Sequence, residues 1–515
     1  MILLGSTFMV YLMAAFAGDP LEEARLIQNE EERAAKIQML TRALNLDVPA
    51  PIRYLMWLRG VGGLFIGKLD LGGSGEGEPV VDSLGLAIPT TLRLVFAATI
   101  LAIVVGITVG IITALRQYSA FDYTMTFVSF LFFSLPVFWV AVLLKEFGAI
   151  GLNDFMWAVG NEDALIGWEW IVVLSLASGA LFAGIISGDR AKSLRVFLLS
   201  GGATAAVLLY MSFTHWFATP AIGPVVFAAL SVGVAFMFTV ISTGLSNRKA
   251  LYASLTMAGL GIALYYPMNL WVFGEGFGLR WLLLLAVVTV LVGVLTGFLF
   301  TKIDRGPVMR TSALTAFSVA GLIVLDKILR SVPDYSSTDA VNGRPIATFS
   351  QENSLLEFTD WTMYPETSKF WFITVDVITH LMLPTLALLI ISFATYVRYA
   401  RLSVLEVLNQ DYIRTARAKG LTERTVIMRH AFRNALVPLA TIVIFDIGGV
   451  LGGAIITENI FGWRGMGTLL NRAIGTYDLN LLMGVSLVTV SIYLVLTIII
   501  EFVYAALDPR IRIED

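Results

Sequence analysis

Long apolar runs, separated by polar loops, make up most of this chain. Nearly every run is long enough for a helix to cross the hydrocarbon core of a bilayer, which takes about 20 residues. The pattern therefore predicts an all-α polytopic membrane protein with about 12 spans. The predicted spans fall within residues 1–17, 91–115, 123–147, 168–187, 196–214, 221–244, 251–273, 281–301, 311–329, 380–408, 435–456 and 481–507.

The composition agrees with this pattern, because 57% of the 515 residues are hydrophobic and only 14% are charged. Soluble domains carry about 25% charged residues. The chain has no cysteine, which excludes disulfides, thiol nucleophiles and Cys-ligated metals, and its three histidines form no metal-binding spacing. The segment from Gly62 to Lys68 has the glycine spacing of a phosphate-binding loop, but Leu69 replaces the hydroxyl residue that holds magnesium. We expect no cofactor, no metal and no nucleic-acid partner, although the net charge of −3 by itself says nothing about nucleic acid.

Basic residues are distributed unevenly between the loops. On one side of the predicted map, the short loops, the region that begins at Arg398 and the tail hold 19 Lys and Arg residues, whereas the short loops on the other side hold 3. The positive-inside rule places the richer side in the cytoplasm. We therefore predict a multi-pass plasma-membrane protein with both termini in the cytoplasm. Residues 1–17 lack a preceding basic region and a clear cleavage site, which predicts an anchor rather than a signal peptide.

Residues 409–438 hold the densest group of basic side chains in the chain. Ala416 and the absence of internal proline favour a helix, and Gly420 can end it. Thr422 can cap the start of a second helix, although Thr425 does not complete a capping box. The pattern predicts two helices joined by a glycine turn and exposed to the cytoplasm. An ordinary basic loop, which the positive-inside bias alone would produce, is the alternative.

The motif DYIRTARAKGL, followed by RHAFRNALVP, resembles the cytoplasmic coupling loop of ABC-importer permeases of the dipeptide, oligopeptide and nickel type. Arg414 and Thr415 stand where the general loop pattern has Glu and Ala, while Ala416 and Gly420 match it. These departures fit the peptide-type branch. The motifs HLMLPTLALLIISFATYVRYARLSVLEVL and TENIFGWRGMGTLLNRAI resemble the same family, as does the tail LDPRIRIED. The resemblance covers about residues 1–147 and 377–515.

The resemblance implies a six-helix permease core with a six-helix transmembrane insertion, because residues 148–376 have no counterpart in it. An even number of inserted spans keeps the later core helices in their orientation. We expect the insertion to lie beside the core as a peripheral bundle, and contact between its acidic segment and a binding protein is the alternative. The expected parts are a first helix at 1–17, an external loop domain at 18–90, core spans at 91–147, the insertion at 148–376 with an external segment at 331–376, and core spans at 377–515 with a coupling loop at 402–434.

The resemblance further implies coupling to partners instead of bond chemistry, so we expect no catalytic residue. The implied partners are a second permease subunit, two ATP-binding subunits, an external substrate-binding protein and membrane lipid. Gly420 would set the angle between two helices that dock on an ATP-binding subunit. The expected coupling residues are Asp411, Tyr412, Arg414, Ala416, Arg417, Lys419, Gly420, Glu423, Arg429, His430 and Asn434.

A second group of residues is expected at the translocation path or outer gate. A carboxylate such as Asp446 within an apolar span faces a cavity or a partner, and we expect a cavity where it could meet a substrate amine. Close helix packing is the alternative role for the glycines near it, harmless packing for Pro136, and simple interfacial anchoring for the outer segment. The expected residues are Pro136, Asp446, Gly449, Gly453, Glu458, Phe461, Trp463 and Gly465.

Together these patterns predict a permease subunit of an ATP-driven importer for dipeptides, oligopeptides or related small solutes, which forms half of the translocation path. Nickel or another solute stays open as the cargo, because similar permeases carry them. A secondary transporter with 12 spans is a further alternative, although the two halves show no obvious repeat and few buried charges for an ion relay. An intramembrane enzyme is disfavoured, because the chain has neither a GxSxG nor an HExxH motif.

Overall fold

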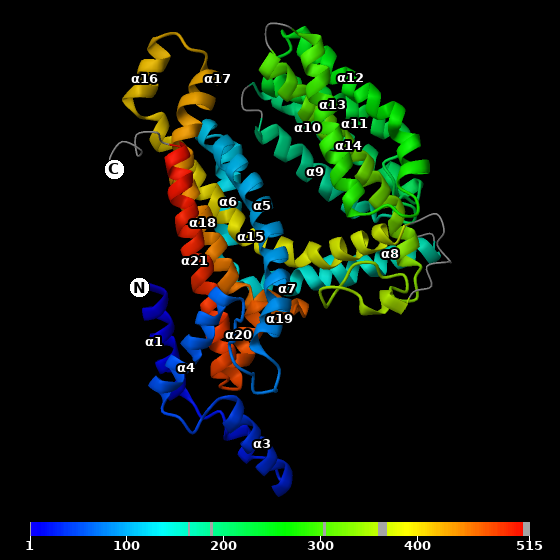
Figure 1. Ribbon diagram of the computed structural model, residues 1–515. Coiled ribbons are helices and arrows are strands. Elements are labelled where there is room, and N and C mark those ends of the chain that lie inside the picture. The colour runs from blue at the N-terminus through cyan, green and yellow to red at the C-terminus, as the bar shows by residue number, and fades with distance from the viewer. Residues whose placement is uncertain (1, 163–164, 186–188, 302–304, 359–367, 508–515) are drawn as a thin grey trace.

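The computed structural model describes residues 2–162, 165–185, 189–301, 305–358 and 368–507 (Figure 1). These described residues form helices and turns, with no β-strand beyond one isolated bridge between Gly73 and Pro79. The predicted all-α fold is therefore confirmed. The helices are α1 (Ile2–Ala17), α2 (Glu22–Arg25), α3 (Glu30–Ala43), α4 (Ala50–Gly62), α5 (Val80–Leu115), α6 (Ala120–Ser134), α7 (Val137–Leu143), α8 (Gly151–Glu162), α9 (Trp168–Ile185), α10 (Arg190–Phe213), α11 (Pro224–Ser242), α12 (Arg248–Pro267), α13 (Leu279–Phe300), α14 (Arg305–Ser336), α15 (Lys369–Leu408), α16 (Asp411–Ala418), α17 (Glu423–Thr425), α18 (Phe432–Gly453), α19 (Ile455–Phe461), α20 (Met466–Gly475) and α21 (Leu479–Leu507).

Ten of the described helices are long and apolar enough to cross a membrane, or eleven if the bent pair α6 and α7 is one span. The predicted count of about 12 exceeds this by one, and α12 accounts for the difference. This helix lies at the predicted span 251–273, but it begins with Arg248 and Lys249 and buries the hydroxyl of Ser254. It nevertheless packs against α11, α13 and α14 of the same bundle.

The centre of the core is the contact between α5 and α15, which run side by side. Small residues of α5 make this approach possible. A Cβ atom added to Gly106 would lie 2.6 Å from the Cβ of Tyr396, and one added to Gly110 would lie 2.6 Å from the Cβ of Ala400. Because such distances are far below van der Waals contact, only glycine fits at these two positions. Helices α18 and α21 then pack beside this pair, and α1 lies against α21.

The third predicted span, 123–147, breaks instead of bending gently. Helices α6 and α7 meet at 101°, and the break falls at Leu135 and Pro136. Proline has no N–H to continue the helix, and it forces the residue before it into an extended conformation, here φ −81° and ψ 128°. From the break the chain continues through the π-helical segment Leu144–Ile150 into α8. Figure 1 shows α7 and α8 running beside the first half of α15, away from the core axis.

Each of the six helices expected in the insertion is present, from α9 to α14. Helices α9 and α10 form a close hairpin, in which Thr204 donates a hydrogen bond to Ser178 at 2.8 Å. Helices α11 to α14 form a second group around Phe227, Tyr265 and Val319. This group lies to one side of the core helices and meets them through the contact of α14 with α15 (Figure 1).

One buried carboxylate holds the second group together. Asp326 of α14 has no exposed surface and accepts hydrogen bonds from the backbone N–H of Ile222, from the Tyr265 hydroxyl at 2.7 Å and from Arg330 Nε at 2.8 Å. A buried charge is tolerated when it is paired and its remaining lone pairs are satisfied. This network explains how α14 carries a carboxylate within a candidate span.

The polar segment after the insertion is shorter than the expected 331–376. Helix α14 extends to Ser336 and α15 begins at Lys369, so residues at both ends of the expected segment are helical. The buried Tyr335 donates a hydrogen bond to Asp376 at 2.8 Å, which ties the end of α14 to the first turns of α15. Between the two helices the described residues 337–358 form turns that pack on the core, where Ile346 lies among Leu94, Leu383 and Trp463.

Candidate functional site

The predicted helix, glycine turn and helix are present in residues 411–431. Helix α16 ends in a Schellman motif: the N–H of Gly420 donates to Arg417 O at 2.9 Å and the N–H of Leu421 donates to Ala416 O at 3.4 Å. Gly420 adopts φ +76°, a left-handed conformation that glycine reaches without steric cost. The sequence prediction of a glycine turn is confirmed here.

The second helix of the hairpin is not a separate element. Thr422 caps it as predicted, since its hydroxyl accepts from the N–H of Thr425 at 3.4 Å. The chain then passes from α17 through the π-helical segment Val426–Ala431 directly into α18. The hairpin is therefore rigidly connected to a core helix on one side and, through residues 409–410, to α15 on the other.

The hairpin has an apolar underside and a polar outer surface. Ile413, Ala416, Val426 and Ala431 are buried together against Val407 and Leu408 of α15. The expected coupling residues occupy both surfaces, and only the side chain of Arg429 lies outside what the structure describes. The structure places Asp411, Tyr412, Arg414, Arg417, Lys419, Gly420, Glu423 and Asn434 at exposed positions, His430 at a half-buried one and Ala416 underneath.

Two interactions fasten the exposed surface. Arg417 donates to both carboxylate oxygens of Glu423, at 2.6 and 3.2 Å, across the glycine turn. This hydrogen-bonded guanidinium holds the pKa of Glu423 below its ordinary value, although so exposed a pair contributes about 1 kcal/mol at most. Asn434 Nδ2 donates to the Tyr412 hydroxyl at 3.0 Å, which joins α16 to the start of α18. The exposed residues therefore form one fixed surface.

Sequence reasoning missed the ion pair that braces this end of the core. Arg401 of α15 donates from Nε and Nη2 to the two oxygens of Asp122 on α6, at 2.8 and 3.0 Å. Asp122 is only 2% exposed and also accepts from the N–H of Tyr118. The available signal was a lone acid in the short loop RQYSAFDY together with Arg401 in the family-like motif, but the pairing needs the fold to bring them together.

Asp446 of α18 has partners on α15. Its carboxylate accepts from the Tyr396 hydroxyl at 2.8 Å and from Ser392 Oγ at 3.1 Å, and the side chain is half-buried. These hydrogen bonds connect two core helices. Asp446 therefore has hydrogen-bonding partners, which the sequence analysis considered as the alternative to a cavity. The exposed Pro136 lies at the break between α6 and α7, and the surroundings of Gly449 and Gly453 lie outside the description.

The other four expected gate residues are brought together in one buried cluster at the opposite end of the core. Glu458 of α19 is fully buried and accepts from Thr91 Oγ1 of α5 at 2.7 Å and from the N–H of Thr468 at 2.9 Å. Phe461 and Trp463 are 2% and 1% exposed. A Cβ on Gly465 would lie 2.3 Å from the Glu458 carboxylate. The segment TENIFGWRGMG is thus a compact turn anchored on α5.

Glu458 organises this turn electrostatically as well. Burial raises the pKa of its carboxyl group, while hydrogen bonds from Thr91 and from the backbone N–H groups of Thr468 and Gly467 act in the opposite direction. Thr91 in turn accepts from the N–H of Met466 at 2.7 Å, the first residue of α20. The carboxylate therefore links the first half of α5 to α19 and the start of α20, and α19 and α20 lie at the end of the core far from α16 (Figure 1).

Known proteins resemble the part of the chain that contains the hairpin α16–α17 and the Glu458 turn. The family described as "Binding-protein-dependent transport system inner membrane component" matches residues 338–513. The oligopeptide transport system permease protein OppB of Mycobacterium tuberculosis is 40% identical over 159 residues, 31% of this chain and 49% of that protein. The dipeptide transport system permease protein DppB of Escherichia coli K12 is 42% identical over 138 residues, 27% of this chain and 41% of that protein.

A putative peptide permease protein of Brucella suis is 46% identical over 138 residues, 27% of this chain and 43% of that protein. The chain thus spans about half the length of the curated relatives it matches. The matched region begins before α15 and includes the hairpin α16–α17 and the Glu458 turn. Residues 338–513 are thus similar to inner membrane components of binding-protein-dependent transport systems, and these relatives are named as peptide transport permeases.

Proposed function

We propose that this chain is the permease subunit of an ATP-driven importer of peptides, and that it forms half of a translocation path. The observation that carries the proposal is the exposed hairpin α16–α17, held at the end of two core helices by an apolar underside. A partner that moves this hairpin would also move α15 and α18, because the hairpin is joined to both helices. Replacement of Gly420 with valine, which should lower ATP-driven peptide uptake, tests the proposal.

The core geometry supports a two-state coupling mechanism. A transporter needs two conformations whose balance a partner can shift. The Asp122–Arg401 pair fastens α6 to α15 near the hairpin, and the Asp446 hydrogen bonds fasten α18 to α15 farther along. Movement of the hairpin would pass along α15 and α18 to the Glu458 turn, which packs on α5 at the far end. In this proposal, ATP hydrolysis takes place on two cytoplasmic subunits and not on this chain.

The proposed assembly has three kinds of protein partner besides lipid. Two ATP-binding subunits contact the hairpins, a second permease subunit completes the path, and an external binding protein delivers the substrate near the Glu458 turn. The family description of residues 338–513 supports the binding-protein partner. Peptide is proposed as the cargo, ahead of nickel or another solute, because the relatives are named as peptide permeases. A secondary transporter is not favoured, since it would have no use for a binding-protein-dependent component.

The proposed orientation places α16, α17 and both termini in the cytoplasm, and α12 offers a sharp test of it. Cysteine at Ser246 lies just before α12, and cysteine at Glu275 lies just after it; both residues are exposed. Glu275 is preferable to its neighbour Gly276, whose φ of +78° disfavours cysteine. We expect a membrane-impermeant maleimide to label Glu275→Cys from outside and Ser246→Cys only from the cytoplasm. The unmodified chain has no cysteine and serves as the unlabelled control. Labelling of both from one side would remove α12 from the span map.

We also propose that the insertion is a peripheral bundle and not part of the path. Its helices α11 to α14 pack on one another and meet the core through α14 and α15. Buried charge within that group is satisfied internally, at Asp326. In a membrane, lipid can cover the apolar surface of α15 that removal of the bundle would expose, although the indole N–H of Trp371 would lose the Phe273 carbonyl that accepts from it at 3.0 Å.

A deletion tests this peripheral placement. Trp157 and Gly343 are close in space, since a Cβ on Gly343 would lie 3.2 Å from the Trp157 ring. A short Gly/Ser linker can therefore replace residues 158–342. We expect this variant to reach the membrane and to retain peptide uptake within about tenfold of the intact chain, a change of roughly 1.4 kcal/mol in the limiting barrier. Asp376 loses Tyr335 but keeps the N–H of Asn353 at 3.2 Å. An assembled variant without any uptake would place the bundle in the transport mechanism.

A further inference from the structure

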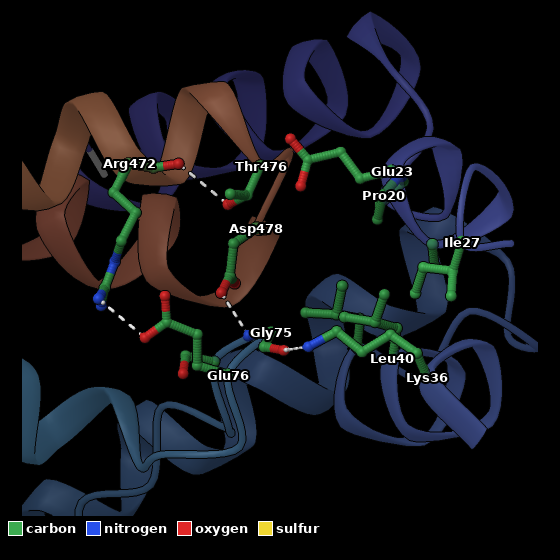
Figure 2. Close-up of a pocket in the computed structure, with 13 residues that line it drawn as sticks. Pro20, Glu23, Ile27, Lys36, Leu40, Gly75, Glu76, Arg472, Thr476 and Asp478 are labelled. Carbon is green, nitrogen blue, oxygen red and sulfur yellow. Dashed lines mark hydrogen bonds and ion pairs between the residues drawn. The ribbon is translucent and has the colours of Figure 1, made fainter. Parts of the chain in front are cut away.

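A pocket of about 340 Å³ lies at the end of the molecule far from α16 and α17, outside the clusters described above (Figure 2). Three separate parts of the chain enclose it: residues 20–44 with α2 and α3, the glycine-rich loop 72–78, and the end of α20 with the residues that follow. Its lining residues are Pro20, Glu23, Ala24, Ile27, Lys36, Leu40, Leu44, Ser74, Gly75, Glu76, Arg472, Thr476 and Asp478.

Hydrogen bonds and an ion pair fix the floor of this pocket (Figure 2). Asp478 accepts from the N–H of Gly75 at 2.6 Å through one oxygen, and through the other from the N–H of Leu481 at 3.0 Å, at the start of α21. Arg472 pairs with Glu76 at 3.0 Å. The loop is thus tied to two helices more than 390 residues away in sequence, at Arg472 and Asp478. A pocket with so many fixed walls is preformed, as ligand sites usually are.

One polar group in the wall lacks a protein partner. Ser74 is 1% exposed, and its hydroxyl makes no hydrogen bond to any described residue. Buried hydroxyl groups almost always have a partner, because leaving one unsatisfied costs roughly 1–3 kcal/mol. The hydroxyl oxygen itself has no accessible surface, so a ligand in the pocket would become its partner once the Ser74 side chain rotates toward the space that this residue lines.

Two charged side chains in the pocket, Glu23 and Lys36, remain available to a ligand, and they carry opposite charges. Glu76 is paired with Arg472, and Asp478 is satisfied by backbone N–H groups. Glu23 forms no ion pair within the described part of the chain, and Lys36 donates to the carbonyl of Gly75 at 3.3 Å. Figure 2 shows Glu23 and Lys36 on opposite sides of the opening, with Ile27 and Leu40 beside them. The pocket therefore offers a cation site, an anion site and an apolar wall.

We propose that this pocket binds a short zwitterionic peptide. The terminal ammonium faces Glu23, the terminal carboxylate faces Lys36, an apolar side chain lies on Ile27, Leu40 and Leu44, and the peptide backbone hydrogen-bonds the Ser74 hydroxyl. A volume of about 340 Å³ suits a dipeptide better than a longer chain. The choice of a peptide over another zwitterion rests on the proposed transport function, whereas the charge arrangement rests on the pocket alone.

Binding of the dipeptide Ala-Leu to the intact chain in lipid nanodiscs, measured by titration calorimetry, tests the proposal. We expect saturable binding, and Ser74→Val, Glu23→Gln and Lys36→Met should each raise the Kd by about tenfold. Glu31→Gln is the matched control: this residue is also an exposed acid, on the first turn of α3, and it does not line the pocket. Its Kd should equal that of the unmodified chain.

Blocked peptides assign each charge to its partner. N-acetyl-Ala-Leu should bind weakly and gain nothing from Glu23, so Glu23→Gln should not weaken it further; Ala-Leu-amide should behave likewise with Lys36→Met. Absence of Ala-Leu binding, or binding unaffected by all three pocket substitutions, would overturn the site. Equal affinity for free leucine would overturn the peptide assignment. The measurement needs neither ATP nor partner subunits, so its failure is distinguishable from failure of the proposed transport function.

Discussion

Replacing Gly420 with valine is expected to reduce ATP-driven peptide uptake by about tenfold or more, while the protein stays in the membrane at its normal level. Gly420 adopts φ +76°, where a residue with a side chain pays roughly 1–2 kcal/mol and a β-branched one more. No atom lies within 4 Å of an added Cβ, so the cost is backbone strain and not a clash. Relief of that strain reorients α16 against α17, and the docking surface changes shape without loss of the core.

The matched control is Gly420→Asn, because asparagine tolerates the left-handed conformation at this same exposed position. We expect the asparagine variant to keep most of the uptake, with alanine between the two. Uptake of a labelled dipeptide into proteoliposomes that contain the partner subunits gives the rate, and co-purification of the ATP-binding subunits reports docking. Normal uptake by the valine variant would contradict the assignment of α16–α17 as the coupling hairpin.

The hairpin α16–α17 could be predicted from sequence because its determinants are local. Ala416 and its neighbours favour helix, Gly420 provides the left-handed residue and Thr422 provides the cap; each lies within a few residues of what it stabilises. The continuation of α17 into α18 escaped prediction, because the π-helical segment Val426–Ala431 has no distinct sequence signal. The same local logic predicted the six helices of the insertion.

Features that depend on long-range contact could not be predicted in the same way. Pro136 predicts a break before α7, but the 101° bend depends on the packing of α7 and the π-helical segment Leu144–Ile150 against α15. Asp446 accepts from Tyr396 and Ser392, which lie at least 50 residues away on another helix, so the sequence alone favoured a cavity over a pair. Glu458 was expected at a gate, but its contact with Thr91 crosses 367 residues. Sequence patterns show that such a residue is unusual and do not show what it touches.

Removing the guanidinium of Arg401 is expected to have the second large effect, this time on folding. Arg401→Met leaves the Asp122 carboxylate, 2% exposed, without its counter-charge, although the N–H of Tyr118 and the hydroxyl of Thr126 still donate to it. Removing one partner of a buried ion pair typically costs about 3–5 kcal/mol, because the other charge stays buried. We expect a clear drop in the yield of folded protein and in the Tm measured in detergent, together with loss of uptake.

Two further variants separate the buried charge from the loss of packing. The double variant Arg401→Met with Asp122→Asn has no buried charge, so its Tm should recover most of the difference. Arg398→Met is the matched control one turn earlier on α15; its guanidinium stacks 4.6 Å from the centre of the Phe133 ring and has no acidic partner among the described residues. Loss of that contact should cost about 1 kcal/mol or less. If the double variant were no more stable than Arg401→Met, the loss of stability would come from lost side-chain packing. The ion pair would then not be the contact that holds α6 against α15 near the hairpin α16–α17.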